Sequence, residues 1–216
     1  MDYKGTICII DDDEAVRESL RLLLFVNGYQ SQSFDSADAF LASNTLDKFE
    51  TIVLDYRMPG TDGLELQQIL QKRNCRTPII FISGHGDIPV AVAAIQKGAS
   101  DFLTKPFEEG ALLAKIGTAV ASFREQLSEF EQLESLQSIY ANLTPRETDV
   151  MRLIVQGRLN KQIGDELGIS PRTVEIHRAH VMEKMAAGSV AELVRMATLL
   201  NSQERLIQIR SESAPT

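Results

Sequence analysis

Short apolar runs alternate with longer amphipathic segments over the first 120 residues of the chain. The apolar runs are rich in branched side chains, which is typical of strands buried on both faces of a sheet. The predicted strands span residues 5–10, 29–34, 52–55, 78–82 and 101–103. The predicted helices begin near residues 14, 36, 64, 87 and 108. This alternation predicts an α/β fold, a flavodoxin-like sheet of five parallel strands in the order 2-1-3-4-5.

A long amphipathic helix is predicted next, because residues 110–143 contain no proline and their apolar positions recur in steps of three and four. The apolar seam consists of Leu113, Ile116, Val120, Phe123, Leu127 and Phe130, followed after a shift in phase by Leu133, Leu136 and Tyr140. Two interpretations stay open. The helix is a rod that forms dimers or carries a signal, or its first half is ordinary core and its second half a solvated tether.

The last third of the chain predicts four helices. Thr144 is expected to cap the first, with Pro145 at its first position and Glu147 completing a capping box. Asn160 and Ser189 are expected to cap the second and fourth. The second and third helices are predicted over residues 161–167 and 171–185, joined only by residues 168–170. So short a joint containing a glycine is typical of a helix-turn-helix.

In a helix-turn-helix the second helix of the pair enters the major groove of DNA. Val174, Val181 and Met185 share one face of that helix and are expected in the core. His177 fits a buried structural role as well as it fits a DNA contact. The candidate DNA contacts are Lys161, Arg172, Thr173, Glu175, Ile176, Arg178, Ala179, His180 and Lys184. Spacing alone also fits a helical bundle without a DNA role.

Polar side chains follow four of the five predicted strands. Carboxyl ends of parallel strands meet at one edge of a sheet, where ligands bind. The residues are Asp11 and Asp12 after the first strand, Asp55 after the third, Ser83 after the fourth and Lys105 after the fifth. Clustered carboxylates suit Mg2+, and an aspartate can accept a phosphoryl group as a nucleophile. An aspartate that only caps the next turn is the simpler alternative for Asp55 taken alone.

Composition and charge narrow the class of protein. The net charge of the 216 residues is −8, but the acidity is uneven. Residues 1–142 hold 12 basic and 21 acidic side chains, and residues 143–216 hold 10 and 9. This balance argues against nonspecific coating of nucleic acid but permits a local basic face. No apolar run approaches the roughly 20 residues that span a bilayer, so we expect a cytoplasmic protein without a membrane partner. Cys8 and Cys75 are expected as free thiols.

Taken together, the strand-end motifs resemble those of the receiver domain of two-component response regulators. The motifs are Ile10-Asp11-Asp12, Leu54-Asp55-Tyr56-Arg57-Met58-Pro59-Gly60, Ile82-Ser83-Gly84 and Thr104-Lys105-Pro106. The resemblance implies that Asp55 accepts a phosphoryl group from a sensor histidine kinase.

The resemblance also implies how the neighbouring residues act. Mg2+ would be held by Asp11, Asp12, Asp55 and the backbone carbonyl of Arg57. Lys105 would bind the phosphoryl group, Ser83 would move toward it, and Phe102 would turn inward. In many relatives the position of Phe102 is Tyr, whereas Phe carries no hydroxyl group.

The C-terminal helices resemble the LuxR-type DNA-binding domain, most closely its FixJ-type subfamily. The resemblance is carried by residues 169–178, which read Ile-Ser-Pro-Arg-Thr-Val-Glu-Ile-His-Arg, and by Val-Met-Glu-Lys-Met at 181–185. It implies binding to duplex DNA as a dimer on paired half-sites. A homodimer formed on phosphorylation and, at the promoter, RNA polymerase are the further partners expected.

We therefore expect a phosphorylation-switched transcription factor rather than an enzyme, beyond its own phosphoryl transfer and slow dephosphorylation. The expected divisions are a receiver domain at 1–122, a helical linker at 123–142, a DNA-binding domain at 143–202 and a flexible tail at 203–216. One rival is a Mg2+-dependent phosphohydrolase acting through Asp55, although Arg57 stands where its general acid is needed. Another is an interaction module whose C-terminal domain binds protein or RNA.

Overall fold

The structure, a computed structural model, describes residues 3–84 and 88–212, with the side chains at all these positions except 47, 88–90 and 202–212. The chain forms two compact units, residues 1–127 and 128–216. The helix α5 runs through the boundary between them, and each unit has its own apolar core. The predicted helix start at Asp87 lies outside the described residues.

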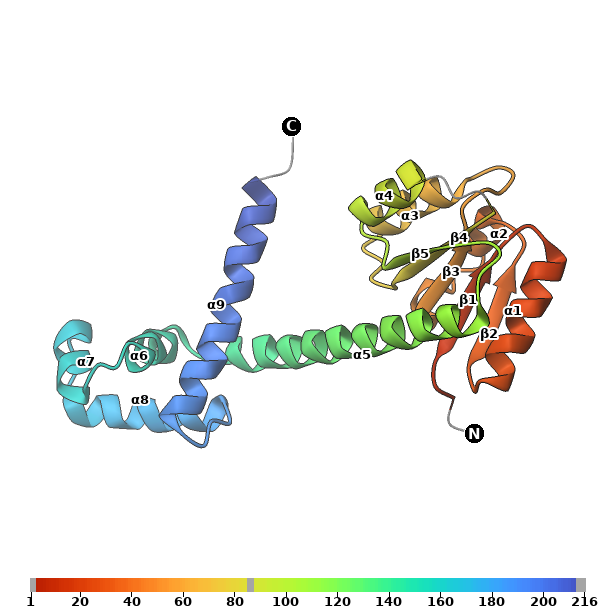
Figure 1. Ribbon diagram of the computed structural model, residues 1–216. Helices are drawn as coiled ribbons and strands as arrows, with labels where there is room; N and C mark the ends of the chain where they lie inside the picture. The colour runs from red at the N-terminus through yellow and green to blue at the C-terminus, as the bar shows by residue number, and fades with distance from the viewer. Residues whose placement is uncertain (1–2, 85–87, 213–216) are drawn as a thin grey trace. The chain divides into compact units, whose positions relative to one another are not determined.

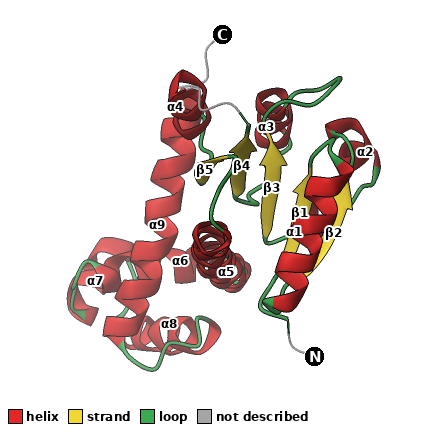
Figure 2. Cartoon of the chain, turned by 45° about the vertical axis from the view of Figure 1, so that its right-hand side comes forward, coloured by secondary structure: helices red, strands yellow, loops and turns green. Residues whose placement is uncertain are grey.

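The N-terminal unit is a five-stranded parallel sheet in the order β2-β1-β3-β4-β5, which confirms the predicted topology. Its strands lie side by side and run in the same direction (Figure 2). They are β1 (Thr6–Ile10), β2 (Gln30–Phe34), β3 (Thr51–Asp55), β4 (Ile79–Ser83) and β5 (Asp101–Thr104). The helices are α1 (Glu14–Val26), α2 (Ala37–Ala42), α3 (Gly63–Lys72), α4 (Ile88–Gln96) and α5 (Glu109–Tyr140), with a short 3-10 turn, η1 (Leu46–Lys48), that the sequence pattern did not predict.

Alternate residues of the central strands supply two separate cores, one on each face of the sheet. Cys8, Ile52 and Phe81 face α2, α3 and α4 and pack with residues such as Phe40 and Leu66. On the other face, Ile7, Ile9, Val53, Ile80 and Ile82 pack with residues of α1 and α5 such as Leu24 and Ile116. Burial of each large apolar side chain contributes about 1.5–3 kcal/mol. The packing on both faces therefore fixes the positions of the strands. It also fixes the edge of the sheet at which the strands end.

Side chains also fix where the helices begin. Asp13 caps α1 by accepting hydrogen bonds from the backbone of Ala15 and Val16, at 2.8 and 3.4 Å. Asp62 and Glu65 form a capping box at the start of α3, which sets the exit of the chain from the loop after β3. The amide of Gln67 on α3 donates to the carbonyl groups of Ala94 and Lys97, at 3.2 and 2.9 Å. This bond ties α3 to the end of α4.

The predicted long helix is confirmed: α5 is continuous over 32 residues (Figure 1). Its first part belongs to the N-terminal core through Leu112, Ile116 and Val120. Its last turns belong to the C-terminal core, where Leu136 is buried and Tyr140 packs beside it. The second half is therefore not simply a solvated tether, because its end forms part of the C-terminal unit.

The C-terminal unit contains α6 (Pro145–Val155), α7 (Asn160–Leu167), α8 (Pro171–Lys184) and α9 (Val190–Glu212). Val174 and Val181 on α8, and Met185 directly after it, are fully buried, as predicted. The turn between α7 and α8 is tight. Gly168 ends α7 with φ of 66°, in the left-handed region that glycine adopts without strain. A Cβ atom at Gly164 would lie 2.7 Å from the carbonyl oxygen of Ile169, so the turn closes only on a glycine.

Two details of the C-terminal unit differ from the expectations. The second helix begins at Asn160 itself, and its start is closed by the side chain of Gln162, which accepts a hydrogen bond from the backbone of Leu159 at 2.9 Å. The segment expected as a flexible tail from residue 203 is helical through Glu212. Residues 203–212 contain neither glycine nor proline, so nothing in their backbone preference ends the helix that α9 begins.

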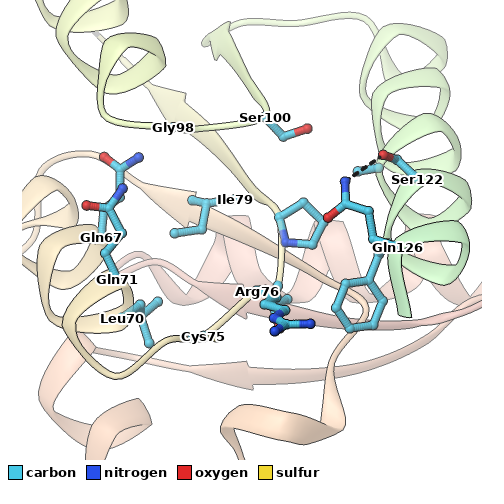
Figure 3. A pocket seen from close by; sticks show the side chains of 14 residues that line it. Gln67, Leu70, Gln71, Cys75, Arg76, Ile79, Gly98, Ser100, Ser122 and Gln126 are labelled. Carbon is cyan, nitrogen blue, oxygen red and sulfur yellow. Dashed lines mark hydrogen bonds between the residues drawn. The ribbon is translucent and has the colours of Figure 1, made fainter. Parts of the chain in front are cut away.

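A cavity of about 260 Å3 opens at the edge of the sheet where strands begin (Figure 3). Its walls include Pro78 and Ile79 at the start of β4, Ser100 before β5, and Ser122 of α5. The cavity therefore lies at the edge of the sheet opposite the carboxyl ends of the strands.

We predict that Gly164→Ala destabilises the C-terminal unit by about 1–3 kcal/mol, because the new methyl group would overlap the carbonyl oxygen of Ile169. Urea unfolding followed by circular dichroism at 222 nm measures the change. Gly110→Ala is the matched control, since a Cβ atom there meets nothing within 4 Å. If Gly164→Ala is as stable as the control, residue 164 and the carbonyl oxygen of Ile169 do not lie as close together as described.

Candidate functional site

Four of the five strands deliver a polar side chain to one edge of the sheet. Asp11 directly follows β1, Asp55 is the last residue of β3, Ser83 is the last residue of β4, and Lys105 directly follows β5. The strand register aligns these ends, since Ile10 pairs with Leu54 and Ser83 with Thr104. The backbone amide of Lys105 also donates to the carbonyl of Ser83 at 2.7 Å, which fixes the chain after β5 against the end of β4.

The ammonium group of Lys105 joins two carboxylates at this edge. Its Nζ donates to Oδ2 of Asp11 at 2.7 Å and to Oδ1 of Asp55 at 2.8 Å. Asp11 is fully buried and Asp55 is 6% exposed. Two buried carboxylates repel each other at short range, and an ammonium group shared between them offsets the repulsion. Lys105, Asp11 and Asp55 are thus brought together from three different strands.

The second oxygen of each carboxylate accepts a hydrogen bond from the backbone. Oδ1 of Asp11 accepts from the amide of Asp13 at 2.9 Å, and Oδ2 of Asp55 accepts from the amide of Arg57 at 2.8 Å. The loop after Asp55 is held close, because a Cβ atom at Gly63 would lie 2.7 Å from the carbonyl oxygen of Asp55. In each carboxylate, one oxygen is held by Lys105 and the other by a backbone amide, so both groups have a fixed orientation without a ligand.

Burial and charge act in opposite directions on these groups. Burial raises the pKa of Asp55, and the hydrogen bond and charge of Lys105 oppose that rise without cancelling it. For Lys105 burial lowers the pKa, but the hydrogen bonds to Asp11 and Asp55 outweigh it and leave the pKa raised. Lys105 therefore stays a cation at neutral pH, and its charge opposes the effect of burial on Asp55.

The remaining predicted residues of the receiver motif lie on the same strands or directly after them. Asp12 is exposed beside Asp11, and its backbone carbonyl accepts from Arg17 at 3.0 Å. Ser83 is buried. Phe102 is half-buried against the core of the sheet and pairs in register with Phe81. The edge thus combines oxygen donors, one cation and a buried hydroxyl group.

The second candidate site is the surface of α8. Most of the residues proposed to contact DNA from sequence are exposed. Ile176 is 51% exposed, and Thr173 and Arg178 are half-buried. The side chains of Arg172 and Glu175 pair with each other at 3.5 Å along the helix. The exposed members are Lys161, Arg172, Glu175, Ile176, Ala179, His180 and Lys184.

Lys184 has a partner that the sequence did not indicate. Its Nζ donates to Oε2 of Glu147 at 2.6 Å, so the cation near the end of α8 is paired with a buried carboxylate near the start of α6. The same oxygen accepts from the backbone of Thr144 at 2.8 Å in the predicted capping box. The hydrogen bond from Lys184 is the main cause that lowers the pKa of Glu147 from 4.5 to about 2. This pair fixes α8 against α6.

Other residues that order the site have no signature in the sequence pattern. Arg17 donates to the carbonyl groups of Asp11 and Asp12, and Lys115 of α5 pairs with Asp101 of β5. Both are ordinary helix-surface cations by sequence. The partners of Arg17 are backbone carbonyl groups, and the partner of Lys115 lies on a different element 14 residues earlier, so only the folded arrangement identifies them.

Comparison with known proteins identifies both units. Residues 7–117 match the response regulator receiver domain, and residues 141–197 match the luxR family of bacterial regulatory proteins. The chain is 44% identical over 197 residues to the transcriptional regulatory protein FixJ of Bradyrhizobium diazoefficiens, covering 91% of this chain and 96% of that protein. This chain belongs to the response regulators of two-component systems.

Other relatives agree with this assignment. The response regulator protein TmoT of Ectopseudomonas mendocina is 44% identical over 199 residues, covering 92% of this chain and 90% of the relative. The solved structure of the response regulator StyR matches with a TM-score of 0.82 and 42% identity, covering 89% of this chain and 98% of that one. Full-length FixJ from B. japonicum matches with a TM-score of 0.59 and 42% identity, covering 93% and 99%.

The response regulator thus combines a receiver domain with a LuxR-type DNA-binding domain, and it is a phosphorylation-activated regulator of transcription rather than an enzyme of metabolism. Within its described residues no helix has both the length and the apolar character needed to cross a bilayer.

We predict that acid destabilises the C-terminal unit partly through Glu147. A carboxylate whose pKa is lowered on folding contributes stability above its ordinary pKa and loses it as pH falls toward the folded value. The free energy of unfolding should therefore fall between pH 4.5 and about 2. Glu147→Gln should be less stable at pH 7 by about 1.5–3 kcal/mol and show a shallower decline in that window.

Urea unfolding at a series of pH values measures this decline. Glu183→Gln, an exposed change on α8 in the same unit, is the control and should keep the wild-type slope. Equal slopes for the wild-type protein and Glu147→Gln would contradict a role for the Glu147 pair in acid sensitivity.

Proposed function

We propose that Asp55 is the phosphoryl acceptor of this response regulator and that a sensor histidine kinase is the donor. The observation that carries the proposal is the shared ammonium group of Lys105, which joins Asp55 to Asp11 at the carboxyl edge of the sheet. An oxygen of Asp55 attacks the phosphorus of the donor's phosphohistidine, the phosphorus–nitrogen bond breaks, and the imidazole leaves with its electron pair. The product is an acyl phosphate on Asp55.

The donor set at this edge fits Mg2+. Asp11, Asp12 and Asp55 offer carboxylate oxygens, and the backbone carbonyl of Arg57, two residues after Asp55, would offer another oxygen. Hard oxygen donors with room for phosphate oxygens are what Mg2+ prefers. When bound, the ion would neutralise charge on the transferring phosphoryl group. The burial of Asp11 and Asp55 supports the fit, because two buried anions are stabilised by added positive charge.

Phosphorylation changes what Lys105 pairs with. The new group adds about −1.5 to −2 charge and three acceptor oxygens. One oxygen of Asp55 becomes the bridging oxygen of the acyl phosphate, so Lys105 gains stronger acceptors on the phosphoryl group than the one it loses. Ser83, at the end of β4, supplies a hydroxyl group toward the same oxygens. We propose that Phe102, next to β4 in the sheet, follows this movement and alters the outer surface of β5.

The output would be dimerisation and promoter binding. A ligand shifts a two-state equilibrium only by contacts that differ between the states, and the phosphoryl contacts of Lys105 and Ser83 are such contacts. The phosphorylated chain would form a homodimer whose paired α8 helices read half-sites about 10 bp apart. Such a dimer in the cytoplasm would meet RNA polymerase at the promoter. Slow loss of the phosphoryl group by the receiver itself would reset the switch.

On the DNA side, residues of α7 and α8 would contact bases and phosphates. Glu175 and Ile176, with Ala179, would face base edges, since a carboxylate accepts from the amino group of cytosine and Ile and Ala contact thymine methyl groups. Arg178, Arg172, Thr173 and Lys161 would contact phosphates. We propose Lys184 as a phosphate contact only in competition with Glu147, since that carboxylate already holds its ammonium group at 2.6 Å.

We predict that Asp55→Asn abolishes formation of the acyl phosphate, because an amide oxygen is a poor nucleophile. Incubation with a small phosphoryl donor and Mg2+, followed by mass spectrometry of the intact protein, measures the added 80 daltons. Asp13→Asn is the matched control: this acid lies at the same edge, but its role is to cap α1, and asparagine caps equally well. Labelling of Asp55→Asn at the wild-type level would place the acceptor elsewhere.

We predict that Arg178→Ala weakens promoter binding about equally on all sequences and lowers the slope of log affinity against log salt by about 0.9, as the loss of one phosphate contact requires. Titration of the phosphorylated protein with duplex DNA at several salt concentrations measures both quantities. Arg152→Ala, which removes an exposed arginine of α6 paired with Glu166, should change neither. An unchanged affinity for Arg178→Ala would remove that residue from the interface.

A further inference from the structure

A second cluster of metal-binding side chains lies in the C-terminal unit. One carboxylate oxygen of Glu147 and one ring nitrogen each of His177 and His180 lie within 4.8 Å of one another. Glu147 is the third residue of α6, and the two histidines stand three residues apart on α8. Residues at that spacing lie on the same face of a helix. The three donors therefore converge from two helices that pack together.

The surroundings of His177 and Glu147 are typical of metal ligands. Nδ1 of His177 is buried and finds no hydrogen-bond partner among the described residues. A buried nitrogen without a partner is unusual and calls for an explanation, which a bound ion would supply. The carboxylate of Glu147 is oriented by its other oxygen, Oε2, which accepts from Lys184 and Thr144. Its Oε1 lies 3.6 Å from Nδ1 of His180.

The donor set selects a class of metal ion. Two imidazoles and one carboxylate suit Zn2+, Co2+ or Ni2+, whereas Mg2+ and Ca2+ prefer oxygen donors only. Zn2+ bonds of about 2.0–2.2 Å place ligand atoms about 3.3–3.6 Å apart in a tetrahedron. The separation of 3.6 Å between Glu147 and His180 already fits this geometry, and the other separations need a contraction of at most about 1.5 Å. The side chain of His180 is 52% exposed, so it has room to turn, and a fourth position would open to water.

Lys184 acts as an outer partner of this cluster. Its hydrogen bond keeps the Glu147 carboxylate ionised and turned toward the histidines, as hydrogen bonds to metal-ligating carboxylates commonly do. Its positive charge also disfavours a second cation nearby, which predicts moderate rather than very tight binding.

We propose that Glu147, His177 and His180 form a transition-metal site, with Zn2+ as the ion that fits best. The ion joins the start of α6 to the middle of α8, and α8 is the helix that carries the DNA contacts. The site lies in the other unit from Asp55 and takes a different class of ion from the receiver carboxylates. Metal binding here is therefore an input to the DNA-binding unit that is separate from phosphorylation.

A titration with Zn2+ tests the proposal. It uses the untagged, metal-free full-length protein in excess Mg2+, so that the receiver carboxylates are saturated. Calorimetry should show one Zn2+ bound per chain, and the midpoint of thermal unfolding should rise and return on adding a chelator. Co2+ in place of Zn2+ should give the visible absorption of a four-coordinate site. His177→Gln and His180→Gln should each weaken Zn2+ binding by at least about tenfold.

The controls separate this site from the rest of the protein. Glu183→Gln on α8 should bind Zn2+ like the wild type, and so should Asp55→Asn, because the site does not depend on the receiver. Circular dichroism of the metal-free histidine variants shows that they are folded. The proposal is wrong if the double variant His177→Gln/His180→Gln keeps the wild-type Zn2+ affinity and thermal shift. It is also wrong if Glu183→Gln lowers both quantities as much as the histidine variants do.

Discussion

The ammonium group of Lys105 lies between two buried carboxylates, and the arrangement of the whole sheet edge depends on that position. Asp11 and Asp55 come from adjacent strands, so parallel pairing necessarily brings them close. Without a cation between them, burial and mutual repulsion would favour protonating one of the two acids. The fold thus holds two carboxyl groups at close range against a single ammonium group. A group that offers Lys105 better hydrogen-bond acceptors will therefore change the ion pairs at the ends of three strands at once.

A comparable arrangement orders the DNA-binding unit. The carboxylate of Glu147 is buried and held by the ammonium group of Lys184, and it links the start of α6 to the end of α8. Here the ion pair sets the position of a helix rather than the reactivity of a side chain. Both domains place a buried carboxylate against a lysine that is distant in sequence, which makes each pair sensitive to tertiary packing and insensitive to local helix preference.

Much of the receiver could be predicted from the sequence, because its signals are local. Each buried strand is a short apolar run, and the polar residue after Ile10, Leu54, Ile82 or Thr104 is read directly from the chain. Parallel pairing then places those residues at one edge without further information. The helix-turn-helix was predictable for the same reason, from a capping box at Thr144 and a three-residue joint after Leu167.

The rest depends on contacts between residues far apart in the sequence. The capping role of Glu147 was visible in the pattern, but its second partner, Lys184, lies 37 residues away and looked like a surface cation. Nothing in the sequence pattern marks Gly164 within its predicted helix, and only the close approach of Ile169 shows why no side chain fits there. The helical continuation of α9 was missed because a polar, charged segment at the end of a chain has the composition of a tail as well as of an exposed helix.

The role of Lys105 is tested most directly by a crystal structure of the protein with Mg2+ and beryllium trifluoride, a stable mimic of the phosphoryl group. We predict that the mimic is bonded to a carboxylate oxygen of Asp55, and that Nζ of Lys105 has left that oxygen for a fluorine atom. The mimic on another residue, or Lys105 still shared between Asp11 and Asp55, would contradict the account.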